Sequence, residues 1–191
     1  MLRPLKGAPS EMSDEALIAA CGQGDTAALG ALFDRHADSV YRFLARMSGT
    51  DRQDLDDLMQ STFIEIQKSA NRYRGHAAVR TWIFGIAANV VRHHIRNEKR
   101  RKGLLDAVKT LPPPPNDAPD DVALRNQQLK RLALGVGALS YKLRVVFVMC
   151  DLEGVSGVEA ARILGVRQGT IWRRLHDARK SLSNAIERRD K

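Results

Sequence analysis

Apolar residues recur along most of the chain at the three- and four-residue spacing of amphipathic helices. Strand-like alternation of apolar and polar residues is absent. Ser13 can cap the first predicted helix, GQGD at 22–25 separates it from the second, and Thr81 is expected to cap the long fourth helix. The pattern predicts an all-α protein with helices over about 14–21, 26–48, 52–69, 81–102, 123–134, 139–153, 156–164 and 169–182.

The clearest pattern is that of residues 156–182, SGVEAARILGVRQGTIWRRLHDARKSL, which predicts two helices joined by a tight turn. Val158, Ala161 and Leu164 share one side of the first helix, and Gly165 can end it in the left-handed conformation. Val166 is expected to be a buried plug. A small residue at the crossing and a glycine at the turn are typical of a DNA-binding helix-turn-helix.

In the second helix of this motif, one apolar stripe and one polar face oppose each other. The stripe consists of Ile171, Leu175, Ala178 and Leu182, and the opposite face carries Arg173, His176, Asp177 and Lys180, with Trp172 at its edge. The alternative interpretation is an ordinary helical hairpin with a solvated basic face.

Charge and proline content divide the chain into two predicted domains. The net charge of +9 favours a polyanionic partner, and it is distributed as +4 over 1–102, −3 over 103–122 and +8 over 123–191. Four consecutive prolines at 112–115 predict a flexible acidic linker. The predicted units are a tail at 1–12, a domain at 13–102, the linker at 103–122 and a second domain at 123–191.

The predicted helix at 52–69 has an acidic outer face. Leu55, Leu58, Met59, Phe63 and Ile66 form its core stripe. The outer face carries Asp54, Asp57, Gln60, Ile64 and Glu65. An exposed isoleucine among acids indicates a protein-binding surface.

Residues 72–102 are strongly basic, with nine lysines and arginines against the single acid Glu98. Tyr73, Trp82 and Phe84 interleave with these charges, a pattern that suits single-stranded or melted nucleic acid on which bases can stack. The alternative is that Trp82 and Phe84 belong to the core.

Several classes of function are disfavoured. Cys21 and Cys150 are far apart in the sequence, so neither a zinc site nor a disulfide framework is expected, and a reduced, cytoplasmic compartment fits. We expect no signal peptide, membrane span, metal or cofactor. His36 is interpreted as a core histidine without an acid partner. A nuclease would need clustered side chains, and Asp56, Asp57, His93 and His94 lie on different predicted helices, so no catalytic residue is assigned.

Four motifs in this order resemble those of bacterial sigma factors of the extracytoplasmic-function (ECF) type, which keep sigma regions two and four. DLMQSTF at 57–63 is similar to the helix that grips core RNA polymerase, and YRGHAAVRTWIFGIAAN at 73–89 to the promoter-melting loop and promoter-reading helix. LSYKLRVVFVMCDLEGVSGVEAARILGV at 139–166 and GTIWRRLHDARKSL at 169–182 resemble the two halves of region four.

The resemblance implies a non-enzymatic initiation factor that binds core RNA polymerase and reads promoter DNA at the −10 and −35 elements. It implies polymerase binding by Asp57, Gln60 and Ile64. The implied −10 residues are Tyr73, Arg74, Gly75, His76, Ala77, Arg80, Asn89, Arg92, His93 and Arg96. The implied −35 residues are Arg167, Gln168, Thr170, Trp172, Arg173, Arg174, His176 and Lys180.

The resemblance further implies an anti-sigma factor as a partner. The sequence departs from the family pattern at His76, Ala88, Trp172, Arg173 and Asp177, so no promoter sequence is assigned. The alternative function is a stand-alone helix-turn-helix regulator, which leaves residues 57–102 without a role.

Overall fold

In the computed structural model of the chain, which describes residues 11–49, 52–105 and 132–187, the regular elements are all helical. The first half holds α1 (Asp14–Gly22), α2 (Thr26–Ser48), α3 (Arg52–Ser69), the short 3-10 turn η2 (Ala70–Arg72) and α4 (Val79–Leu105). The second half holds a helix over 132–138, α6 (Tyr141–Phe147), the π-helical turn η3 (Val148–Leu152), α7 (Gly157–Leu164) and α8 (Gln168–Glu187). The predicted all-α fold is confirmed, whereas most of the predicted linker and the start of the helix expected at 123 lie outside the described residues.

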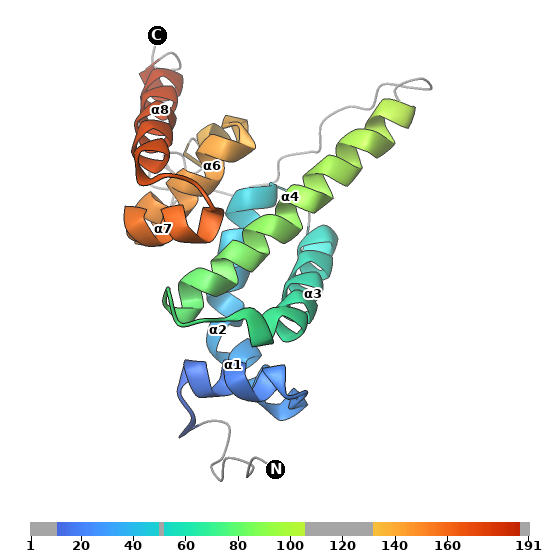
Figure 1. Cartoon of the computed structure of the whole chain (residues 1–191). Helices are drawn as coiled ribbons and strands as arrows, with labels where there is room; N and C mark the ends of the chain where they lie inside the picture. Colours follow the sequence, from blue (N-terminus) through green and yellow to red (C-terminus); the bar gives the residue numbers. More distant parts are fainter. Residues whose placement is uncertain (1–10, 50–51, 106–131, 188–191) are drawn as a thin grey trace, which may run out of the picture.

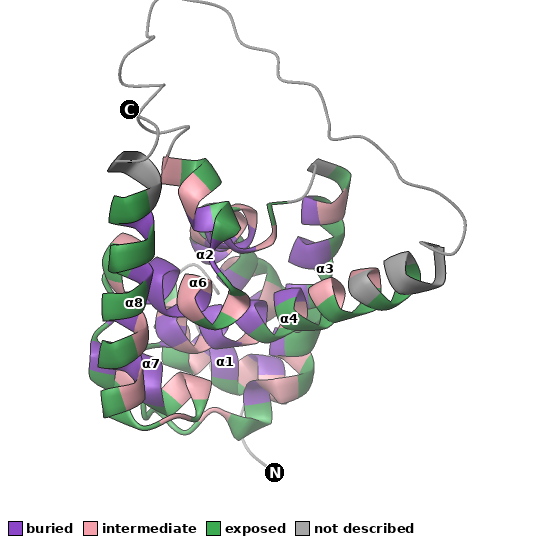
Figure 2. Cartoon of the chain, turned by 90° about the horizontal axis from the view of Figure 1, so that it is seen from above, coloured by how far each residue is buried: buried purple, intermediate pink, exposed green. Residues whose placement is uncertain are grey.

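The N-terminal helices pack around the long helix α4, with α2 and α3 against it and α1 at the lower end (Figure 1). Phe43 of α2 and Phe84 of α4 are fully buried, and their rings stack with centroids 4.7 Å apart. The C-terminal helices pack on the opposite side of α4 from α3 (Figure 1). Buried side chains form one continuous cluster from α1 to α8 (Figure 2).

Local capping explains several helix ends. Ser13 accepts a hydrogen bond from the Ala16 N–H at 3.2 Å, and Asp25 accepts from the N–H of Ala27 and of Ala28. Ser156 caps α7: its hydroxyl oxygen accepts from the Glu159 N–H at 3.2 Å, and the hydroxyl donates to the Glu159 carboxylate at 2.9 Å. Gly165 ends α7 with φ of 65°, as the sequence predicted.

The predicted cap at Thr81 is wrong. Helix α4 already begins at Val79, and Thr81 is buried within its first turn. The Trp82 N–H donates to the carbonyl of Ala78 at 3.0 Å, while the Ala78 N–H reaches Glu159 of α7 at 3.4 Å. A carboxylate from another helix therefore lies at this helix end, where the helix dipole favours negative charge.

The apolar side predicted for the first helix of the helix-turn-helix is also partly wrong. Val158 is 49% exposed, and the buried positions of α7 are Gly157, Ala160 and Ala161. Gly157 is buried because the Trp172 indole covers it, only 2.9 Å from where a Cβ would stand. Val166 is half-buried rather than a fully buried plug.

His36 has an acid partner, so the prediction that it has none is wrong. Its Nε2 lies 2.9 Å from Asp14 Oδ2, and Arg35 Nη1 lies 2.9 Å from Asp14 Oδ1. Asp14 belongs to α1 and both partners to α2, so this cluster ties the first two helices together. Its members are distant in sequence, and spacing alone gave no sign of the pairing.

Candidate functional site

The predicted polymerase-binding residues form an exposed ridge on α3. Asp57, Gln60 and Ile64 are all exposed, and Ile64 keeps 43% of its surface. Gln60 and Ile64 border an apolar groove of about 540 Å³ between α2 and α3. Asp57 lies on the other side of the ridge, in a second groove between α3 and α4.

Phe33 is a functional candidate that the sequence analysis did not assign to any site. It is 44% exposed and lines the groove between α2 and α3, with its ring 4.8 Å from that of Phe63. Asp38 and Asp56 also line this groove. The groove between α2 and α3 is therefore apolar with acids beside it, which suits a partner helix that carries apolar and basic side chains.

The predicted promoter loop is a compact turn. The Tyr73 hydroxyl donates to the Ala77 carbonyl at 2.7 Å, and its ring meets the Trp82 ring edge-on at 5.3 Å. Gly75 has φ of 70°, a conformation that favours glycine. Burial raises the pKa of Tyr73, so its hydroxyl remains a protonated donor.

The side chains of this loop and of the helix after it differ in how far they are exposed to solvent. Arg74, Gly75 and His76 are exposed, whereas the Ala77 side chain is buried. Tyr73 and Trp82 are half-buried. Phe84 is fully buried against Phe43, so the alternative that placed Phe84 in the core is the correct one.

The predicted −10 residues on α4 fall into two groups, one exposed to solvent and one held in an ion pair. Asn89, Arg92, His93 and Arg96 are exposed along one side of the helix, and Asn89 and His93 border the same groove as Asp57. Arg80 instead forms an ion pair with Glu153, and its guanidinium carbon lies 4.6 Å from the centroid of the Phe84 ring.

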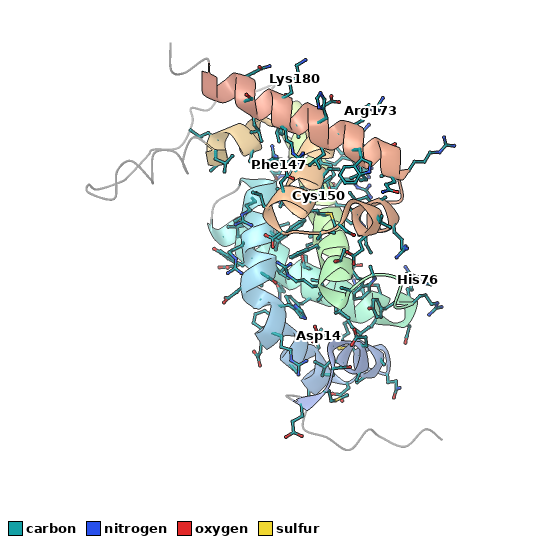
Figure 3. All side chains as sticks on the ribbon, turned by 90° about the vertical axis from the view of Figure 1, so that its left-hand side faces the viewer. Asp14, His76, Phe147, Cys150, Arg173 and Lys180 are labelled. Carbon is teal, nitrogen blue, oxygen red and sulfur yellow. The ribbon has the colours of Figure 1, made fainter. Side chains whose placement is uncertain are left out.

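The predicted −35 residues lie on and beside α8, outside the core. Arg167, Gln168, Trp172, Arg173, His176 and Lys180 are exposed, whereas Thr170 and Arg174 are half-buried. Figure 3 shows Arg173 and Lys180 on the side of α8 that faces away from the rest of the chain. Ile171 and Leu175 bury the opposite side, as the stripe predicted.

Not every basic residue of α8 is available to a partner. Arg179 binds Asp151 of η3 through two hydrogen bonds, Nε to Oδ2 at 2.8 Å and Nη2 to Oδ1 at 2.6 Å. The hydrogen bonds to this carboxylate raise the pKa of Arg179. This pair orients α8 on the element before the helix-turn-helix.

The described residues provide no evidence for a metal or redox centre. Among residues 11–49, 52–105 and 132–187, no three His, Cys, Asp or Glu side chains gather in a way that could hold a metal ion. Cys21 is buried, and burial raises the pKa of its thiol to about 11; burial likewise raises the pKa of Cys150. In the same ranges, no helix is long and apolar enough to cross a bilayer.

Comparison with known proteins gives consistent matches over both halves. The family model for Sigma-70 region 2 matches residues 32–101, and that for Sigma-70, region 4 matches residues 129–182. The chain is 31% identical to the ECF RNA polymerase sigma factor SigM of Mycobacterium tuberculosis, with 94% of this chain and 88% of SigM covered. It is 27% identical to the ECF RNA polymerase sigma-E factor of Haemophilus influenzae, with 93% and 97% covered.

Solved structures agree on the fold. CnrH, solved in complex with the cytosolic domain of CnrY, matches with a TM-score of 0.64 and 26% identity, covering 91% of this chain and 97% of CnrH. The sigma factor RpoE of Bartonella quintana, solved with the anti-sigma factor NepR, matches with a TM-score of 0.65 and 20% identity, covering 81% and 94%.

Proposed function

The chain belongs to the ECF group of RNA polymerase sigma factors, and on this premise we propose which of its surfaces meet polymerase and promoter. It directs RNA polymerase to initiate transcription, and the stand-alone helix-turn-helix regulator is not favoured. That alternative would leave unexplained the match to Sigma-70 region 2 over residues 32–101.

We propose that the groove between α2 and α3 binds core polymerase, with Gln60 and Ile64 on its edge and Phe33 in its wall. The single observation that carries this assignment is the exposure of two large apolar side chains, Phe33 and Ile64, around one groove. By the family resemblance, its occupant is the coiled-coil clamp of the largest polymerase subunit. Asp57 contributes charge beside the contact.

We propose that the loop at 73–77 and the exposed side of α4 read the −10 element. Arg74 and His76 are exposed on the loop, and Asn89, Arg92, His93 and Arg96 continue the surface along α4. We propose the −35 element as the target of the α8 face at Trp172, Arg173, His176 and Lys180, with Arg167 and Gln168 at its start.

We also propose a cellular compartment, a protein partner and a division into two domains. Sigma factors are non-enzymatic regulators, and we propose that this chain likewise catalyses no reaction and acts in the cytoplasm. By the family resemblance we propose an anti-sigma factor as a partner of this chain; CnrH, to which the chain is similar, was solved in complex with the cytosolic domain of CnrY. We also propose that residues 13–102 and 123–191 are separate domains, which the two separate family matches support.

The recognition helix gives the first test. Arg173→Ala is expected to weaken upstream promoter binding by about 1–3 kcal/mol and relax specificity at one base pair, because an arginine fork binds guanine bidentately. Transcription from a mapped promoter and its point variants measures this effect. Lys142→Ala is the control, because it removes an exposed positive charge on α6, outside the proposed −35 surface. Unchanged base preference in Arg173→Ala would contradict the assignment.

The promoter loop gives the second test. Replacing Arg74, Gly75 and His76 together by alanine is expected to impair strand opening while leaving upstream duplex binding intact. Gly75 contributes because its φ of 70° is unfavourable for alanine, and the other two lose exposed polar side chains. Permanganate footprinting measures the melted region. A normal footprint in the triple variant would remove the loop from the promoter-opening surface.

A further inference from the structure

An ion pair bridges the two halves of the chain at the promoter-reading end of α4. Glu153, just after η3, has a side chain only 4% exposed. It pairs with Arg46 of α2 through one carboxylate oxygen and with Arg80 of α4 through the other. Arg80 also donates to the Glu153 main-chain carbonyl at 3.1 Å.

Other contacts place the helix-turn-helix beside the promoter loop and the first turns of α4. Arg162 of α7 donates to the carbonyl of His76 in the promoter loop. Ile163 lies so close to α4 that a Cβ on Gly85 would stand 2.3 Å from its Cγ2. Figure 3 shows His76 on a loop beside the helix-turn-helix.

Further polar contacts cross the junction, beside the buried apolar side chains that the two halves share. Arg144 Nη1 donates to the Met47 carbonyl at 2.7 Å, and the Tyr141 hydroxyl donates to the Ala88 carbonyl at 2.7 Å. Burial raises the pKa of Tyr141 to about 12, which keeps this donor protonated. A cavity of about 460 Å³, lined by Arg46 and Val136 among others, remains at the junction. Polar contacts beside an open groove are features of an interface between domains, which is more polar than a domain core and can separate.

This closed arrangement does not fit simultaneous reading of two promoter elements. Elements named −10 and −35 lie about 25 base pairs apart, or roughly 85 Å at about 3.4 Å per base pair. Gln168 follows Arg162 by six residues, so α8 begins within roughly 20 Å of the residue that contacts the promoter loop.

We propose that Glu153 is an internal competitor for promoter DNA: its pairs with Arg46 and Arg80 hold the chain closed and occupy Arg80, a basic residue of the predicted −10 set. The proposal rests on the proposed function. The Glu153 carboxylate competes with phosphate for the Arg80 guanidinium, which it already neutralises by an ion pair. Opening replaces the carboxylate by DNA at Arg80 and leaves Arg46 to solvent.

Arg46 offers the sharpest test, because it belongs to this ion-pair cluster but not to the proposed DNA surface. We call the pairs of Glu153 with Arg46 and Arg80 the lock. Removing a positive charge normally weakens DNA binding, whereas loss of the lock predicts tighter DNA binding. Arg46→Ala and Glu153→Gln are compared with wild type, using the full chain and a fluorescent random-sequence single-stranded 20-mer. Arg42→Ala, an exposed position one turn earlier on α2, is the charge-matched control.

Both lock variants are expected to bind the 20-mer about three- to tenfold more tightly, and Arg42→Ala to bind no better than wild type. Small-angle scattering is expected to show a larger radius of gyration for both lock variants, and amide exchange at 73–80 to accelerate. Circular dichroism confirms folding; if Glu153→Gln does not fold, Arg46→Ala alone decides. A compact Arg46→Ala chain, or one that binds DNA no better than Arg42→Ala, would overturn the proposal.

Core-polymerase binding by the same variants separates this proposal from the function on which it rests. Variants that open but never bind polymerase would refute the proposed function alone. Variants that bind polymerase but stay closed when free would refute the lock alone.

Discussion

Ile64→Arg is expected to abolish promoter-specific transcription while the fold survives. Ile64 is 43% exposed beside the groove between α2 and α3, so the new side chain can point into solvent in the free protein. In the complex the same arginine would be buried without a partner, at a cost of about 2–5 kcal/mol. Affinity for core polymerase should therefore fall roughly 30-fold or more, measured by competition with wild type for polymerase. Asp57→Arg should act in the same direction by reversing the charge beside the groove.

Asn184→Arg is the control for this experiment, because it makes the same new side chain at an exposed position late in α8. It should compete for polymerase as wild type does. A well-folded Ile64→Arg chain that still competes and initiates normally would show that this groove is not the polymerase-binding surface.

Phe84→Ala is expected to lower the free energy of unfolding by about 3–5 kcal/mol, the usual cost of removing a fully buried aromatic ring. Phe84 has no exposed surface, and its ring stacks on Phe43 at an interplanar angle of 11°. The loss also removes the ring over which Arg80 lies. Chemical denaturation followed by circular dichroism measures the change.

Phe33→Ala is the matched control, since it deletes the same side chain where 44% of it is exposed. Its cost should stay below about 1.5 kcal/mol, because less apolar surface returns to water. Equal destabilisation by the two substitutions would contradict the placement of Phe84 in the core and of Phe33 at the surface.

The sequence predicted most helix boundaries because their causes are local. Ser13 and Asp25 cap helices with their own side chains, and Gly165 ends one by adopting a positive φ. The stripe from Ile171 to Leu182 is buried because its spacing matches the helix period. Such signals are contained within a few consecutive residues.

Features that depend on distant contacts were not predictable. The first turn of α4 includes Thr81, and the Ala78 N–H before that turn donates to Glu159, a residue 81 positions later. Val158 points outward and Gly157 inward because Trp172 covers the glycine. Periodicity alone cannot separate two neighbouring residues at the edge of an apolar face.

The candidate site was predictable in part for the same reason. The exposed side of α3 and the outer face of α8 follow from helical spacing, and the structure exposes Gln60, Ile64 and Arg173 as that spacing implies. The groove that contains Phe33 depends on how α2 lies against α3. The ion pair between Arg80 and Glu153 depends on contact between the two halves of the chain.

The sigma-factor function is tested most directly by reconstituting the purified chain with core RNA polymerase. Run-off transcription from genomic promoter fragments is the readout. A sigma factor should form a stable complex with core polymerase and give transcripts with defined start sites that neither core polymerase nor the chain produces alone. A folded chain that binds DNA fragments but neither co-purifies with core polymerase nor yields such transcripts would contradict this function.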